Sequence, residues 1–159
     1  MALIRMFFSS IGRACMSFIF FLGGISKILD FDQSLQSLGE QIIVLPKAFA
    51  IFPWLDEWIM ELSGHTSTLL TIAIVFEILG GILLFLGWRA RFGAFLLILF
   101  LVPASLIFHH FWDLQGPDRN VQMIMFLKNV SIFGGLLYVL VSPKKCGKPQ
   151  VKQPAVSPK

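Results

Sequence analysis

One carboxylate and one lysine lie inside long apolar stretches of the sequence, where a charged group is costly. Glu77 comes ten residues after Ser67, where such a stretch begins, and Lys128 comes seven residues into another. At 1.5 Å per helical residue these positions are about 15 Å and 10 Å deep in a bilayer. A charge at the bilayer centre costs about 2.5 to 3.5 kcal/mol, so each group needs a partner, a proton or a wet cavity.

A lysine stem can cover the difference in depth between the two groups, so the spacing predicts a Glu77–Lys128 ion pair or a shared ligand site. Ala73, Gly80 and Gly81 share the helical face of Glu77 and would let another helix approach it. The alternatives are that Glu77 only bonds neighbouring helices and that Lys128 extends outward to the membrane surface.

Further polar groups lie near the same predicted membrane depth. His109 and His110 close a third apolar stretch, and because neighbouring helical residues diverge by about 100°, only one can face a site. We favour His109 for the pocket and His110 for the interface, although both could simply be interfacial. Carboxyl and imidazole groups can transfer protons. The candidate catalytic residues are therefore Glu77 and His109, and the candidate cofactor-binding residues are Lys27, Lys128, Asn129 and His110.

Four apolar segments must position these groups, at about residues 11–29, 67–86, 92–111 and 121–141. Each has roughly the 20 residues that a helix needs to cross a bilayer. The chain is 56% hydrophobic and only 14% charged, which excludes soluble and disordered classes. We expect an all-α integral membrane protein: a four-helix bundle over residues 1–142, with a long outer loop between helices 1 and 2. Residues 143–159 read as a basic disordered cytoplasmic tail.

Charge placement predicts the direction of insertion. Arg5, Arg13, Arg89, Arg91 and the lysines of the tail fall on one side, and the carboxylates other than Glu77 fall on the other. The positive-inside rule then places both termini in the cytoplasm. The net charge of +4 thus reflects orientation, and no nucleic-acid partner is expected. The two cysteines form no Cys-x-x-Cys motif, and the histidines lack metal-ligand spacing, so we expect no metal site.

The order of these residues resembles the DoxX family across about residues 5–141. The resemblance rests on Arg13, Gly24 and Lys27 in the first span, Glu77, Gly80, Gly81 and Gly87 in the second, a histidine closing the third, and Lys128, Asn129, Gly134 and Gly135 in the fourth. Arg13 and the glycines of this set, Gly87 aside, are the candidate structural residues. The resemblance implies a four-helix protein of the bacterial inner membrane. Its relatives include the quinone-reducing membrane subunit of a thiosulfate oxidoreductase and components of redox-defence assemblies.

Two functions from different classes agree with this pattern. The first is a subunit of a membrane oxidoreductase system that binds a quinone headgroup in a polar pocket in the outer half of the bundle, among Lys27, Glu77, His109 and Lys128. It would have a soluble or membrane redox partner and no covalently bound cofactor. The second is a non-catalytic membrane scaffold, or a small-solute-binding partner of a redox or stress-response complex. Transport by a single chain is disfavoured, because no inverted repeat or broken-helix pair is visible.

Overall fold

The computed structural model describes residues 2–49 and 54–142, and this part of the chain is helical with no strand. Four of the helices are long and apolar enough to cross a membrane, namely α1, α4, α5 and α6. The expected all-α, four-span membrane fold is therefore confirmed, whereas the basic tail lies outside the described residues. The elements are α1 (Ala2–Leu29), α2 (Phe31–Ala48), α3 (Trp54–Ser63), α4 (Thr66–Leu86), α5 (Ala90–Phe108), the 3-10 turn η1 (Phe111–Asp113) and α6 (Gly116–Val141).

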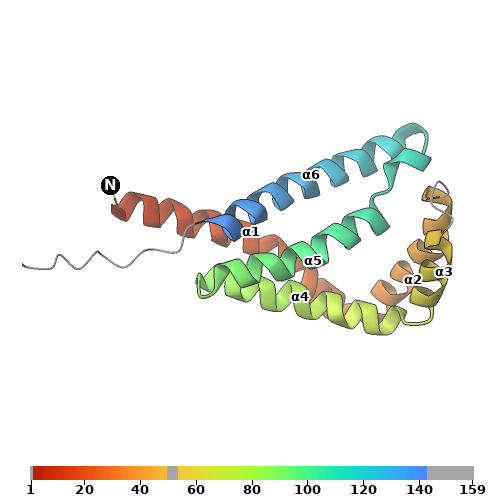
Figure 1. Ribbon diagram of the computed structural model, residues 1–159, viewed down its shortest axis with the longest axis horizontal. Helices are drawn as coiled ribbons and strands as arrows, with labels where there is room; N and C mark the ends of the chain where they lie inside the picture. The colour runs from red at the N-terminus through yellow and green to blue at the C-terminus, as the bar shows by residue number, and fades with distance from the viewer. Residues whose placement is uncertain (1, 50–53, 143–159) are drawn as a thin grey trace, which may run out of the picture.

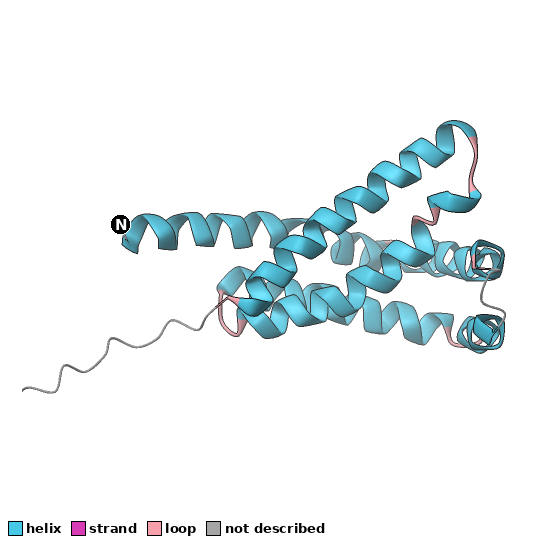
Figure 2. Ribbon diagram, turned by 45° about the horizontal axis from the view of Figure 1, so that its top comes forward, coloured by secondary structure: helices cyan, strands magenta, loops and turns pink. Residues whose placement is uncertain are grey.

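The long helices form a bundle in which α4 lies between α1 and α5, and α6 packs on the other side of α5 (Figure 1). The start of α1 and the end of α6 lie at one end of the bundle, and α2 and α3 lie together at the opposite end. We call these the terminal end and the α2–α3 end. From the terminal end, α4, α5 and α6 diverge from one another in both views (Figure 2). The spanning helices are therefore closest together near the terminal end and farther apart toward the α2–α3 end.

The expected long outer loop is wrong, because α2 and α3 occupy most of that segment. The apolar residues Leu35, Leu38 and Ile42 recur at helical spacing in α2, and the last two are buried against Ile59 of α3 and Leu70 of α4. With 10 residues α3 is too short to span a bilayer, and α2, which has 18, is too polar, so a search for span-length apolar stretches passes over both. They instead close the α2–α3 end of the bundle.

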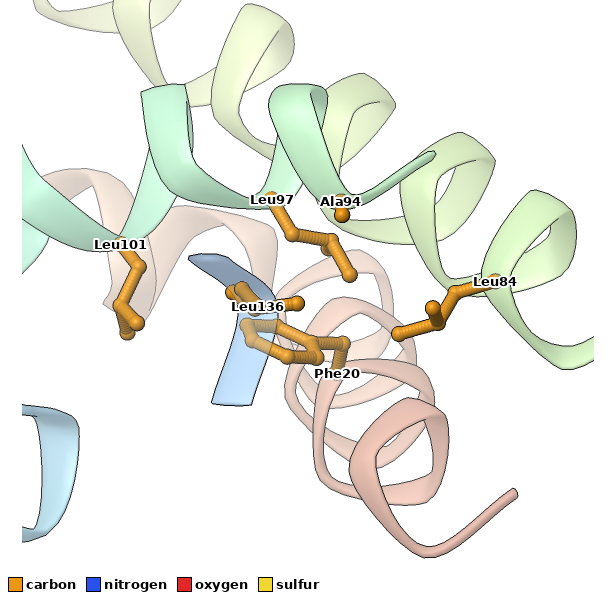
Figure 3. Close-up of a cluster of buried hydrophobic side chains, with 6 residues drawn as sticks. All are labelled: Phe20, Leu84, Ala94, Leu97, Leu101 and Leu136. Carbon is orange, nitrogen blue, oxygen red and sulfur yellow. The ribbon is translucent and has the colours of Figure 1, made fainter. Parts of the chain in front are cut away.

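A buried apolar cluster holds the terminal end together. It brings Phe20 of α1, Leu84 of α4 and Leu136 of α6 around Ala94, Leu97 and Leu101 of α5 (Figure 3). Next to this cluster α4 and α5 approach each other closely: a Cβ added to Gly93 would lie only 2.8 Å from the Gly80 carbonyl oxygen. Small residues let helices in a membrane approach to this distance. All four spanning helices are thus fixed to one another near the terminal end.

The predicted structural glycines differ in what surrounds them. Gly24 and Gly80 face atoms that leave no room for a side chain, and a Cβ on Gly135 would lie 2.8 Å from the Met16 sulfur. Gly81 has ordinary contacts with α1, whereas a Cβ on Gly134 would meet no atom of the described residues within 4 Å. A structural role therefore suits the others but not Gly134.

The direction of insertion stays a prediction. Arg119 lies in the first turns of α6, at the α2–α3 end, so the separation of basic and acidic residues between the two ends is incomplete. Arg89 and Arg91, at the turn between α4 and α5, lie at the terminal end as the charge pattern requires.

Candidate functional site

Glu77 forms an ion pair with Lys27, which joins α4 to α1. The Lys27 ammonium donates to Glu77 Oε2 at 2.8 Å and to the Gly23 carbonyl oxygen at 3.2 Å. The Glu77 side chain is 4% exposed and that of Lys27 is 27% exposed. The Lys27 Nζ also lies 5.3 Å from the centre of the Phe100 ring, within range of a cation–π contact. The carboxylate is buried and compensated, while the ammonium keeps an open side.

The predicted Glu77–Lys128 pair is wrong. Lys128 is exposed on α6, and its ammonium lies 3.4 Å from the Met125 sulfur. Helical side chains lean toward the N-terminus of their own helix, and α1 and α6 run in opposite directions. This lean takes Lys27 back one turn, deeper into the bundle and onto Glu77, whereas it takes Lys128 toward the α2–α3 end.

The two histidines have different environments: only His109 lines the cavity, and His110 is buried instead of lying at the membrane interface as expected. His109 Nδ1 lies 2.7 Å from Gln122 Oε1 of α6, a pair in which the ring N–H donates to the amide oxygen. His110 is buried beside η1, with Nδ1 3.0 Å from the Ile107 carbonyl oxygen and Nε2 3.8 Å from Asp113 Oδ2. His110 thus serves the α5–η1 corner, and its expected place among the cofactor-binding residues is not supported by this geometry.

Asn129 makes a second link between α6 and α5, nearer the terminal end than the His109–Gln122 hydrogen bond. Its amide donates to Ser105 Oγ at 3.0 Å, and the Ser105 hydroxyl donates to the Leu101 carbonyl oxygen at 2.6 Å. Ser105 is buried, so this short chain of hydrogen bonds satisfies polar groups inside the span. Asn129 retains its carbonyl oxygen and one N–H for a further partner.

A cavity of about 770 Å³ brings four of the predicted site residues together, in the part of the bundle where the spanning helices are farther apart. Lys27, Glu77, His109 and Asn129 all contribute to its wall, whereas Lys128 and His110 do not. The rest of the wall is largely apolar, with Phe20, Phe76, Phe100 and Phe108 among its side chains. This volume is within the range of about 300 to 1,000 Å³ that small-molecule sites occupy.

Arg13 lies far from the cavity, at the terminal end. Its guanidinium donates to Ser9 Oγ at 2.9 Å and to Ser10 Oγ at 3.2 Å on the same helix. It also packs over Gly87, whose positive φ of 71° lets the chain turn after α4. Arg13 therefore lies against the turn between α4 and α5, and its structural role stays a prediction.

Several residues that the geometry makes important were not singled out from the sequence. Gly23 is the position where a Cβ would overlap Glu77 Oε1, and Gly93 is the other half of the contact with Gly80. Gln122 and Ser105 hold His109 and Asn129 in place. Gly23 lies four residues before Lys27, and Gln122 lies seven residues before Asn129, so helical spacing was the available signal.

Comparison with known proteins places this fold in a family. Residues 8–110, which include α2, α3, α4 and α5, match the family model described as DoxX. The chain is 30% identical to inner membrane protein YphA of Escherichia coli (strain K12) over 132 residues, 83% of this chain and 80% of that protein. It is also 30% identical over 96 residues to the Surfeit locus protein 4 homolog of Schizosaccharomyces pombe, covering 59% of this chain but 32% of that protein. No solved structure matches the chain significantly.

Proposed function

This chain belongs to the DoxX family, and from that premise we propose that it is a subunit of a membrane oxidoreductase system whose cavity binds a quinone-type ligand. We further propose a location in the bacterial inner membrane with both termini in the cytoplasm, from the similarity to an inner membrane protein and the placement of Arg and Lys. The observation that carries the proposal is the Lys27–Glu77 pair at the wall of a cavity that also includes His109.

The polar groups at the cavity fit the two carbonyl oxygens of a quinone. The Lys27 ammonium has three N–H bonds, of which two are directed to Glu77 and the Gly23 carbonyl, so one is left for a ligand oxygen. When His109 Nδ1–H donates to Gln122, the Nε2 atom is left for a second ligand atom. Phe20, Phe76 and Phe100 supply apolar surface for the ring between them.

A bound quinone supplies an acceptor of two electrons and two protons. The chain's own residues would orient the ligand and handle the protons. Each carbonyl oxygen takes up one proton: Lys27 would hold one oxygen and donate a proton to it, His109 in its imidazolium form would donate the other from Nε2, and water would return both protons to the two residues. Glu77 would balance the ammonium charge inside the span. The electrons would come from a partner redox protein.

Binding to the purified protein tests the proposal. The dissociation constant for a short-tailed ubiquinone is measured with the full chain in lipid nanodiscs. Lys27→Met and His109→Phe should each weaken binding at least tenfold. Lys128→Met removes the same charge outside the cavity and should bind like the wild type. Absence of saturable binding, or an equal loss in Lys128→Met, would reject the proposal.

A scaffold remains the second candidate function, and one observation favours it. Glu77 Oε2 accepts from Lys27 while Oε1 lies against Gly23, so both carboxylate oxygens are directed at α1. The pair could therefore act only to hold α1 on α4. In that case Lys27→Met should release a co-purifying partner enzyme without any change in quinone binding, whereas the first proposal expects quinone binding by this variant to fall at least tenfold.

A further inference from the structure

Apolar side chains of α4 and α5 border both the cavity and the outside of the bundle. Ile72 of α4 and Leu99 of α5 both line the cavity, and they are also 45% and 43% exposed on the outside of the bundle. Pro103, one turn beyond Leu99, lines the cavity and is exposed as well. We call these three residues the lateral mouth. At these side chains the cavity comes nearest to the lipid-facing surface of α4 and α5, and Ile19 of α1, which is 41% exposed and also lines the cavity, meets the same two conditions.

The course of the helices explains why the cavity comes near the surface there. The Gly80–Gly93 contact holds α4 and α5 together near the terminal end, and from there the two helices separate toward the α2–α3 end (Figures 1 and 2). Pro103 has no backbone N–H to bond the Leu99 carbonyl, so the helical ladder of α5 is interrupted on the same stretch. The lateral mouth lies in the wedge that results.

The lateral mouth lies at a depth where acyl chains surround the helices. Leu99 comes nine residues after Ala90, about 14 Å along a helix of 19 residues that spans the membrane. Ile72 comes six residues after Thr66, about 9 Å into α4. Both positions lie within the hydrocarbon core, about 30 Å thick, where a water-soluble ligand does not reach.

The opposite part of the cavity wall is polar. Gln33, Ser34 and Ser37 of α2 line it at the α2–α3 end, and the Lys27–Glu77 pair adds a charged group to the same cavity. We infer that the ligand is a single amphiphile whose polar head lies at Lys27 and whose long apolar tail passes through the lateral mouth into the bilayer. This inference rests on the proposed function, and it adds the path of entry and the place of the tail.

Bulky side chains at the lateral mouth test the inference. Ile72→Trp and Leu99→Trp fill the opening. Val75→Trp and Val102→Trp are the matched controls, because these valines lie on the same two helices, are 50% and 41% exposed, and do not line the cavity. Dissociation constants are measured in nanodiscs for two ubiquinone analogues, one with a ten-carbon tail and one with no tail. The tail raises partitioning into the bilayer equally for all variants, so the ratio of each variant to the wild type is the informative quantity.

We expect the two mouth variants to bind the tailed quinone at least tenfold more weakly and the tail-less quinone within threefold of the wild type. The control variants should bind both like the wild type. The inference is overturned if the mouth variants bind the tailed quinone with the wild-type affinity, or if their affinity falls equally for both quinones. It is also overturned if the control variants show the same fall in affinity for the tailed quinone. In each of these cases quinone binding by the wild type still stands. If the wild type binds neither quinone, the proposed function fails and the inference fails with it.

Discussion

Removal of the Lys27 charge should destabilise the protein more than removal of the Glu77 charge. The reason is the difference in burial, since the Glu77 side chain is 4% exposed and that of Lys27 is 27% exposed. Lys27→Met leaves a buried carboxylate without its cation, and breaking a buried pair in this way costs about 3 to 5 kcal/mol. Glu77→Gln leaves an ammonium with an open side and an amide oxygen that can still accept from it, so the cost should be about 1 kcal/mol.

The double variant Lys27→Met/Glu77→Met completes the cycle. Replacement of a buried ion pair by apolar groups of similar volume is often close to neutral, so this variant should be more stable than Lys27→Met alone. With Glu77→Met as the second single variant, we expect a coupling energy of about 2 to 3 kcal/mol between the two positions. Free energies of unfolding can be measured by titration with sodium dodecyl sulfate in mixed micelles, followed by circular dichroism.

Two results would refute this reasoning. One is that Glu77→Gln destabilises as much as Lys27→Met, which would mean that burial does not decide the cost. The other is additivity of Lys27→Met and Glu77→Met to within about 0.5 kcal/mol, which is the behaviour of independent sites. Lys128→Met controls for loss of a lysine in a span, and because Lys128 is exposed it should change stability by less than about 0.5 kcal/mol.

Three further substitutions test other contacts. Gly23→Ala should lower the free energy of unfolding by about 1 to 3 kcal/mol, because the new Cβ overlaps Glu77 Oε1. Gly12→Ala on the same helix meets nothing within 4 Å and should leave stability unchanged or raise it by up to about 1 kcal/mol. Thermal melts that show equal effects for the two variants would contradict this. Gly93→Ala should lower the melting temperature more than Gly23→Ala, because the new Cβ at residue 93 lies 2.8 Å from the backbone oxygen of Gly80, which cannot move aside as a side chain can. A melting temperature equal to that of the wild type would argue against the close α4–α5 contact. Gln122→Leu should weaken quinone binding three- to tenfold, because His109 loses its hydrogen-bond partner. Gln122→Glu keeps an acceptor for the His109 ring and should restore binding. Identical dissociation constants for the two variants would exclude a role of Gln122 in positioning His109.

The four spans and the inward face of Glu77 could be predicted from the sequence because the bilayer imposes both. A span needs about 20 apolar residues, and a carboxylate within it must face protein or a cavity. The partner of Glu77 was not predicted correctly, because depth was counted from each Cα without the lean of the side chain. Lys27 has its Cα near the end of α1 but its ammonium one turn deeper, beside Gly23.

A polar pocket was predicted, but its shape and size could not be, because they depend on how far the helices diverge. Glycines that permit close packing were visible in the sequence, but Gly93 on α5 had to be matched with Gly80 on α4 to fix where the two helices meet. The closure of the α2–α3 end was likewise hidden. It depends on Leu38 and Ile42 packing against residues of α3 and α4, which are distant in sequence.

The polar groups of the cavity depend on α6 to different extents. Lys27 and Glu77 hold each other through α1 and α4, and both lie within the part of the chain that matches the DoxX family. His109 and Asn129 are held by hydrogen bonds between α5 and α6, and α6 follows the matched residues. The ion pair should therefore form whenever α1 packs on α4, whereas the orientation of His109 depends on where α6 lies. The described contacts of α6 with α1 lie near Gly135 and Leu136, whereas the first half of α6 packs on α5 and on η1, where Phe126 contacts Phe111. Substitutions along the first half of α6 should accordingly change which ligand the cavity prefers before they change the stability of the bundle.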